Sequence, residues 1–336
     1  MPLSRPYARI TVDGSRLGAD EAALLRLQVD LGSNGQHDHA EVRLWPRSRL
    51  ADAMPGATLA IALGERDDEQ AVWSGEISAR RQTPDGITLE GLALTVQLSR
   101  AARSQAYRDQ TVADIVRDLA GEVSIDKAQG SLKLHAFYVD NRRPVWSHLR
   151  SLARLVGADL GSAADGGLRF LPAAGAVTPL RLRYGAELLD WQIRRQAAPS
   201  AAAVVAPGAA SEQGDARWHW LAHDPVGAGA GRSRLPAALA TRDGAQAVGE
   251  ALAKRAQRAV FDGQVLLAGN PALRPGDAVQ LSDLPGGDPG TLRVRAVRHS
   301  FDARSGFLTR LVVEGGEGGE TGESDFGGLG ALGGPG

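Results

Sequence analysis

Apolar side chains recur at every second position through much of the first hundred residues. The runs occupy residues 40–44, 57–63, 72–77 and 87–92, and turn residues separate them. In the first run Ala40, Val42 and Leu44 share one face, because successive side chains of a strand point to opposite sides. Several short alternating runs at close spacing predict a small antiparallel β-barrel or sandwich.

A Pro-Gly turn opens an alternating run in each β-rich end of the chain. The first turn is Met54-Pro55-Gly56-Ala57 and the second is Arg274-Pro275-Gly276-Asp277. Proline fixes φ at such a turn and glycine supplies a positive φ, so the register of the following strand is defined. The repeated pattern predicts two similar barrels with other structure between them.

The period of the apolar residues changes from two to that of a helix near residue 111. Thr111 is placed to cap a helix that Gly121 ends, and Pro144 suits the first turn of a second helix that ends at Gly157. Residues 158–171 then have the pattern of a hairpin with a loose turn. The middle of the chain is therefore predicted to be a compact α+β unit.

Strand patterns return from about residue 179, with a third helix predicted over residues 243–259. We expect an α+β fold that is mainly β, in which two antiparallel barrels flank an α+β insert. The expected domains are an N-terminal, tube-like barrel, an α+β domain, a second barrel with long loops and one helix, and a flexible Gly-rich tail. Their ranges are 1–103, 104–186, 187–313 and 314–336.

The composition argues against several classes of protein. The 38 basic and 39 acidic residues nearly cancel, so the positive field expected of a nucleic-acid binder is missing. The sequence has no cysteine, which excludes disulfides, thiolate metal sites and thiol nucleophiles. No apolar stretch approaches the roughly 20 residues of a membrane span, and the N-terminal residues do not resemble a secretory signal. We therefore expect a soluble protein that is synthesised in the bacterial cytoplasm.

No residue pattern in the sequence indicates catalysis. The sequence contains neither a Gly-x-Ser-x-Gly elbow nor a His-Glu-x-x-His motif. His37 and His39 flank Asp38, but a structural metal site requires more ligands than these, so an exposed loop that enters a strand is the favoured interpretation. We expect no catalytic residue, no cofactor and no bound metal.

The tryptophans divide into two groups. Those inside predicted elements are expected in the core: Trp45, Trp73 and Trp146. Those near predicted loops are candidates for interface residues, because exposed tryptophan is enriched where proteins bind each other: Trp191, Trp218 and Trp220. Aromatic residues serve as core about as often as they serve as contacts, so both interpretations stay open for this second group.

Five segments resemble the late control protein D family, the hub proteins of contractile phage tails, whose relatives include the N-terminal hub part of VgrG spikes. These segments are Thr111–Val116, Val145–Ala153, Gly269–Val279, Arg293–His299 and Gly306–Thr309. The resemblance runs in the family's order from about residue 40 to residue 313. It carries over no individual binding residue, and Gly269–Asp277 is matched as a turn and the start of a strand.

The resemblance implies a structural protein rather than an enzyme. Three chains with two barrels each would form a ring of pseudo-sixfold symmetry, joining a sixfold tail tube above to a threefold spike below. The implied partners are two further copies of the chain, the tube protein, a VgrG- or gp5-like spike, and possible tape-measure and other baseplate proteins. No direct nucleic-acid or membrane binding is expected. Because the sequence ends soon after the second barrel, the spike is expected to be a separate protein in a phage tail or a released injection particle.

Two alternatives belong to other classes. The α+β segment between about residues 104 and 186 has room for a glycan, so a peptidoglycan-binding or peptidoglycan-degrading tail module is the main rival. Such a module would need convergent catalytic groups, which the sequence lacks. A tube-terminating or tail-completion protein would share the β-rich architecture without requiring the central helices.

Overall fold

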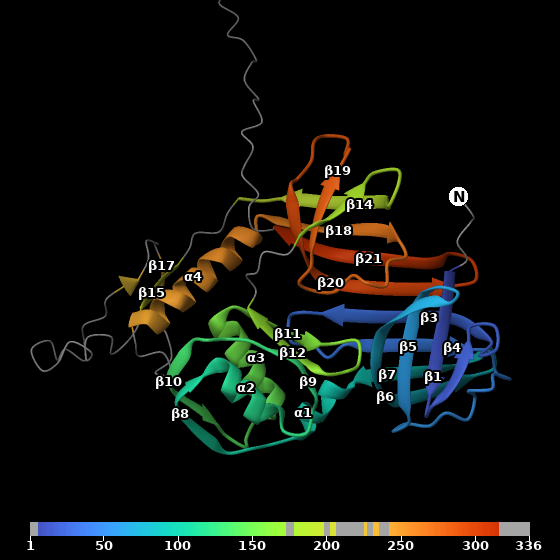
Figure 1. Cartoon of the computed structure of the whole chain (residues 1–336), viewed down its shortest axis with the longest axis horizontal. Coiled ribbons are helices and arrows are strands. Elements are labelled where there is room, and N and C mark those ends of the chain that lie inside the picture. Colours follow the sequence, from blue (N-terminus) through green and yellow to red (C-terminus); the bar gives the residue numbers. More distant parts are fainter. Residues whose placement is uncertain are drawn as a thin grey trace, which may run out of the picture.

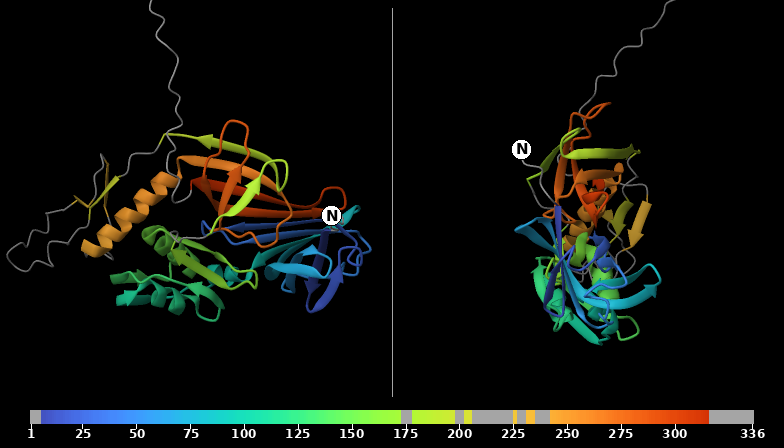
Figure 2. Two further views of the ribbon diagram at one scale, coloured as in Figure 1. Left: turned by 45° about the horizontal axis from the view of Figure 1, so that its top comes forward. Right: turned by 90° about the vertical axis from the view of Figure 1, so that its right-hand side faces the viewer.

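The computed structural model describes residues 6–172, 178–197, 202–205, 225–226, 231–234 and 242–315. A 13-stranded sheet dominates these residues, and a smaller α+β lobe lies beside it (Figure 1). Helix α4 leans against the lobe and the end of the sheet, as the two views of Figure 2 also show. No helix in the described part of the chain is long and apolar enough to cross a membrane. The fold is mainly β, as predicted.

The N-terminal part of the chain supplies the first strands of the large sheet. They are β1 (Pro6–Val12), β2 (Ser15–Gly18), β3 (Leu24–Gly32), β4 (His39–Leu44), β5 (Thr58–Glu65), β6 (Asp68–Thr83) and β7 (Gly86–Ala93). The alternation in β4 is confirmed, since Ala40, Val42 and Leu44 are fully buried. The core placement of Trp45 was wrong: it continues the outward-facing positions of β4 and is 54% exposed.

The lobe follows directly after β7. It comprises η1 (Leu94–Val96), α1 (Gln97–Arg100), β8 (Gln105–Thr111), α2 (Val112–Ala120), β9 (Ile125–Ala128), β10 (Lys133–Val139), α3 (Val145–Val156), β11 (Ala158–Ser162) and β12 (Leu168–Pro172). The predicted helix ends are confirmed, because the Thr111 side chain accepts a hydrogen bond from the Asp114 amide and Gly157 ends α3 in the left-handed conformation. The predicted hairpin is the antiparallel pair of β11 and β12.

The C-terminal part returns to the large sheet. Its elements are β13 (Leu180–Arg183), β14 (Leu188–Arg195), α4 (Arg242–Arg258), β18 (Phe261–Ala268), β19 (Ala278–Ser282), β20 (Thr291–Asp302) and β21 (Gly306–Gly315). A small separate sheet contains β15 (Ala202–Val205), β16 (Pro225–Val226) and β17 (Gly231–Arg234). The predicted third helix is confirmed as α4, and residues 316–336 of the predicted tail lie outside the described residues.

The two halves of the sheet repeat one arrangement of five strands. In the first half β3 pairs with β4, β4 with β7, β7 with β6 and β6 with β5. In the second half β14 pairs with β18, β18 with β21, β21 with β20 and β20 with β19. All these pairs are antiparallel, and their order along the chain is the same. We call β3–β7 the first unit, and β14 with β18–β21 the second unit.

Two register shifts occur at equivalent places in the two units. Register shifts follow equivalent residues: Leu24 in β3 and Leu188 in β14, and then Ile77 in β6 and Val294 in β20. A β-bulge inserts one unpaired residue and bends its strand, so each unit bends at the same two places. Residues at equal distance after these bulges occupy equivalent positions in the two units.

The Pro-Gly turns also have the same geometry. Gly56 and Gly276 have φ of +94° and +99°. The amide of each glycine donates a hydrogen bond of 2.8 Å to the carbonyl of Ile77 in the first unit and of Val294 in the second. The same two residues donate back to the residue after the glycine, at 2.9 and 2.8 Å. The turns therefore fix each unit's third strand beside its fourth.

The expectation of two barrels is met only in part. Both ends of the chain form antiparallel sheets, but no closed barrel is present among the described strands. Instead β20 runs beyond β19 and pairs with β3, which joins the two units into one open sheet. The reason is the length of β20, because its second half continues past its partner inside the second unit.

Two hydrophobic clusters hold these parts together. The first combines residues of both units, including Leu27, Ile61, Val265 and Val294. The second fills the lobe and includes Val248 of α4. Because one core spans both units, separating them would expose apolar surface that is now buried.

Candidate assembly surface

The junction between the two units is a continuous ladder between strands that lie far apart in the sequence. Strand β20 pairs with β3 from Ala296↔Gly32 to Asp302↔Arg26. Across this junction the Arg298 Nε donates to Asp30 Oδ1 at 2.5 Å. The amide of Ser33 donates to the carbonyl of Arg295 at 3.2 Å, which extends the ladder beyond the strand.

Arg274 fastens the second Pro-Gly turn to the first unit. Its guanidinium donates to the carbonyl oxygens of Val72 at 3.0 Å and Ala71 at 2.7 Å, both on β6. Its amide donates to Asp277 Oδ2 at 2.7 Å, which closes the turn. Burial raises the pKa of Asp277, against the lowering effects of that hydrogen bond and of the charges of Arg169 and Arg274. In the second Pro-Gly turn, Arg274 thus binds the turn to β6, and Asp277 closes the turn itself.

The loop before β4 joins the first unit to the lobe. The His37 ring stacks on Trp146 with 4.3 Å between centroids, and its nitrogens lie 3.1 Å from Thr95 Oγ1 and 2.6 Å from Ser99 Oγ. Trp146 Nε1 donates to the Gly35 carbonyl at 2.9 Å. Burial, assisted by the charge of Arg150, lowers the pKa of His37 to about 4.

Asp38 is the most deeply buried carboxylate of this junction, at 2% exposure. It accepts a hydrogen bond of 2.9 Å from the Gly32 amide, and Ser162 hydrogen bonds to it as well. Burial nevertheless raises its pKa to about 7. The segment is a loop that enters β4, as predicted, but it is largely buried rather than exposed. Among the described residues no cluster of His, Asp and Glu that could hold a metal is found.

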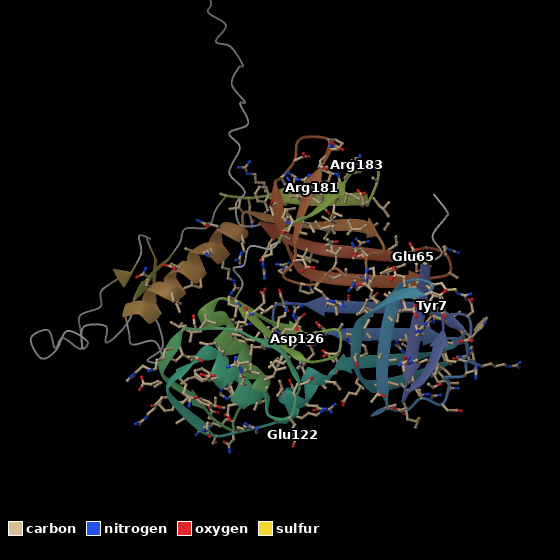
Figure 3. All side chains as sticks on the ribbon, viewed as in Figure 1. Tyr7, Glu65, Glu122, Asp126, Arg181 and Arg183 are labelled. Atoms are coloured by element: carbon tan, nitrogen blue, oxygen red, sulfur yellow. The ribbon has the colours of Figure 1, made fainter. Side chains whose placement is uncertain are left out.

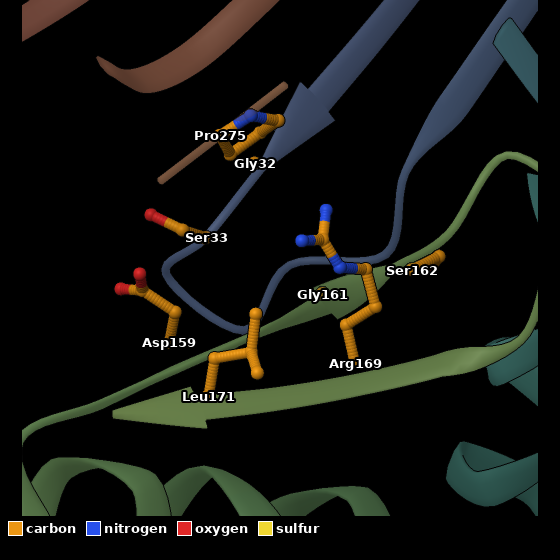
Figure 4. A pocket seen from close by; sticks show the side chains of 8 residues that line it. All are labelled: Gly32, Ser33, Asp159, Gly161, Ser162, Arg169, Leu171 and Pro275. Atoms are coloured by element: carbon orange, nitrogen blue, oxygen red, sulfur yellow. The ribbon is translucent and has the colours of Figure 1, made fainter. Parts of the chain in front are cut away.

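A cavity of about 20 Å³ lies where the two units and the lobe meet. Figure 4 shows Asp159 and Arg169 projecting toward the end of β3 from neighbouring strands, with Pro275 opposite. A space of this size holds about one water molecule and excludes an organic substrate.

A larger cleft of about 700 Å³ opens between the second unit and the helices α3 and α4. Its lining includes Arg150, Arg154, Arg255, Arg258, Arg293 and Arg295. Arg293 pairs with Asp159 and with Glu314, and Arg295 lies 3.5 Å from Asp262. The carboxylates that line the cleft are therefore engaged by arginines, which gives a salt-bridge network.

Of the predicted interface tryptophans, Trp191 lies in the described residues and Trp218 and Trp220 lie outside them. Trp191 is on β14, directly across from Val265, and its ring packs half-buried against the first hydrophobic cluster. Its amide donates to its neighbour Asp190 at 2.9 Å. Its role at an interface stays a prediction.

The structural roles of Arg274, Asp277 and Asp38 were not predicted from the sequence. A charged residue on each side of a Pro-Gly pair was an available signal for the first two, because a turn alone does not require a basic residue. Asp38 gave no such signal, since its burial depends on Ser162 and on strands far away in the sequence.

No protein-family model matches this chain, and no curated protein matches it either. Solved structures match it in fold along nearly its whole length. A tail protein from Neisseria meningitidis has a TM-score of 0.70 at 15% identity, covering 93% of this chain and 96% of that one. The 43 kDa tail protein of prophage MuSo2 from Shewanella oneidensis has a TM-score of 0.66 at 12% identity, with coverages of 91% and 98%.

An Escherichia coli component of the type VI secretion system, which is described as structurally similar to tail proteins of bacteriophage T4, also matches. Its TM-score is 0.59 at 10% identity, covering 90% of this chain and 76% of that one. The chain therefore has the fold of these tail and secretion-system proteins.

Proposed function

We propose that this chain is the baseplate hub of a contractile phage tail or a related injection system. Three copies would form a ring that joins a sixfold tail tube to a threefold spike. The repeated five-strand unit carries this proposal, because three chains with two similar units each present six similar surfaces to a sixfold tube.

The fold of known tail proteins supports the same role. It extends over more than nine-tenths of this chain in the Neisseria and Shewanella proteins, so both units and the lobe are included in the likeness. The sequence resemblance to late control protein D is independent of this comparison and supports the hub position within the tail.

The internal contacts suit a structural role. Arg274, Asp38 and the pairing of β20 with β3 fix the two units and the lobe against one another. A ring that transmits a conformational change from the tail to the spike must keep its units in fixed positions relative to one another. We therefore assign to these residues the positioning of the units rather than any covalent chemistry.

The test is the mass of the purified protein in solution, measured by native mass spectrometry or analytical ultracentrifugation. A hub is expected to form trimers, alone or with its spike, and to leave purified peptidoglycan unbound and intact. A chain that is monomeric in both settings, or that releases soluble fragments from peptidoglycan, would contradict the proposal.

A further inference from the structure

Strands β3 and β14 occupy equivalent places at the outer edges of the two units. Inside the chain, β20 of the second unit covers the outer edge of β3 in the first unit. The strand equivalent to β20 is β6, and the strand equivalent to β3 is β14. The internal junction therefore has a counterpart, β6 with β14, that one chain does not itself form.

Both counterpart edges are open in the described part of the chain. Strand β14 is the end strand of the sheet, and its residues Asp190–Arg195 pair there only with β18. Strand β6 pairs with β5 only as far as Glu76, and its remainder, Ala79–Thr83, pairs only with β7. An open edge presents unpaired amides and carbonyls and is a template for another strand.

The direction of the backbone groups on β14 follows from observed hydrogen bonds. The Gln196 amide donates to the Val260 carbonyl, so the even-numbered residues face β18. By alternation, the amides of Ile193 and Arg195 face outward. The outward amide of Trp191 is bonded to Asp190, which fits the same alternation.

Burial of the core face supplies an independent observation. Leu27 and Val29 lie three and five residues after the bulge of β3, and both are fully buried. Trp191 and Ile193 occupy the same positions after the bulge of β14, yet both are only partly buried. The second unit thus lacks the cover that β20 gives to the first, and an added strand would supply it.

We propose that β14 of one copy pairs antiparallel with Ala79–Thr83 of β6 in the next copy, in the register that β20 and β3 show within the chain. This deepens, and rests on, the proposed hub, since repeating the contact closes a ring. Transferring the register predicts four pairs within the two strands: Arg80↔Arg195, Arg81↔Arg194, Gln82↔Ile193 and Thr83↔Gln192. The first and third are hydrogen-bonded pairs, because their internal counterparts continue the ladder of Ser33 and Arg295.

The predicted contact brings arginines of the two copies together. The internal counterpart of Arg81↔Arg194 is the ion pair of Arg298 and Asp30. In the contact between copies, Arg81 lies 3.7 Å from Glu90 on its own β7, and Arg194 lies directly across from Asp262 on its own β18. Glu90 therefore offsets part of the charge of Arg81, whereas Arg295 engages Asp262 and Arg194 donates to Gln196 at 2.6 Å. The facing pairs Arg81↔Arg194 and Arg80↔Arg195 therefore repel each other, and the pairing is expected to strengthen as salt screens them.

A disulfide cross-link tests the register directly, because the natural chain has no cysteine. The variant carries Arg81→Cys together with Arg194→Cys. Residues that face each other in a non-hydrogen-bonded pair have Cα atoms about 4.5 Å apart, which is within disulfide range. Mild oxidation is expected to convert the variant into a covalent trimer on a non-reducing gel, and each single variant is expected to give at most dimers by chance contact.

The matched control combines Arg194→Cys with Glu65→Cys. Glu65 is exposed in the first unit but ends β5, away from the β6 edge (Figure 3). This control is expected to give no covalent trimer. Native trimers in which Arg81→Cys with Arg194→Cys stays unlinked, or in which the control links equally well, would overturn the edge pairing while leaving the hub proposal standing. Absence of any trimer from the wild-type chain would overturn the hub proposal itself.

Ile193→Pro provides a second, independent variant. It removes an outward amide that no described strand of the same chain uses, so the fold is expected to survive, as circular dichroism would verify. Ile193→Pro loses one backbone hydrogen bond at the contact, so its association is expected to be about tenfold weaker than that of the control Ile193→Val. Sedimentation of the two variants measures the difference. Equal association of the two folded variants would also overturn the pairing.

Discussion

At the scale of single residues, Arg274 connects more of the molecule than any neighbour in its turn. Its guanidinium binds two carbonyls of β6, and its amide binds Asp277. A turn in the second unit is thereby fastened to the first unit, about 200 residues earlier in the chain. Charged hydrogen bonds of this kind contribute more than neutral ones, and losing the donor leaves acceptors unsatisfied.

Replacing this arginine is therefore expected to destabilise the fold. Arg274→Ala should lower the free energy of unfolding by about 2–3 kcal/mol, since it removes a charged donor with two acceptors. Urea denaturation measures the change. Arg304→Ala, at an exposed turn position, is the control and should change stability by less than about 0.5 kcal/mol. Equal stability of the two variants would refute the role given to Arg274.

Asp38 is expected to make stability depend on pH. Its folded pKa is about 7, above its ordinary value of 3.8, so the folded state holds a proton that the unfolded state has lost between these pH values. Stability from this group is thus fully present below pH 3.8 and falls as pH rises toward 7. His37 acts in the opposite sense, because its lowered pKa removes stability as pH falls from 6.5 toward 4.

Asp38→Asn separates the two effects. The stability of this variant minus that of the wild type should increase between pH 4 and 7, by at most about 1.4 kcal/mol per pH unit. The contribution of His37 cancels in the difference. Denaturant unfolding at several pH values measures it, and a difference that is flat or that decreases with pH would exclude a protonated, buried Asp38.

At the scale of elements, the two units share the same strand order and the same turn geometry. Each third strand follows a glycine with positive φ, and the glycine amide bonds the fourth strand at its bulge. A Cβ on Gly56 would meet no atom within 4 Å, and one on Gly276 would meet only ordinary contacts. The strain of a substitution would therefore come from the backbone alone.

Gly56→Ala and Gly276→Ala should consequently have similar effects. Each is expected to cost about 1–2 kcal/mol, the strain of an L-residue in the left-handed region. Gly32→Ala is the control, because its φ is ordinary and its nearest contact is at 3.4 Å. Thermal or urea unfolding gives the comparison. Costs that differ by several kcal/mol between the two turns would argue against their structural equivalence.

Much of the element map was predictable from the sequence. Alternation and capping residues located the strand β4, the helices α2 and α3, and the hairpin of β11 and β12. The pairing of β20 with β3 was not predictable, because periodicity describes one strand at a time and carries no information about its distant partner. The match between the units was visible only at the Pro-Gly turns, since a bulge interrupts the alternation that would otherwise reveal it.

The candidate assembly surface was less accessible to sequence analysis. Trp191 was named, but its half-buried position follows from the missing neighbour of β14 rather than from its local sequence. Short polar strands such as β9 (Ile125–Ala128) gave no pattern, because most of their side chains are exposed. The predicted burial of Trp45 was wrong because it relied on the residue type: large aromatic residues inside a strand are usually buried, whichever face they occupy.

At the scale of the whole molecule, the described strands leave a stretch of edge open on β6 in the first unit and on β14 in the second, and β20 with β3 fills the junction between the units. A ring of three copies would fill every junction and alternate first and second units around its axis. Six similar units would then face the tube. The three lobes would be related by the threefold axis, as are the three subunits of a threefold spike. Permanent interfaces of this kind bury roughly 2,000 Å² or more.

The most direct measurement is a cryo-EM reconstruction of the particle that contains this chain. We predict three copies in one ring, with six five-strand units related by pseudo-sixfold symmetry between the tube and the spike. A map with six copies of the chain, with one copy, or with the chain away from the tube end would contradict the account.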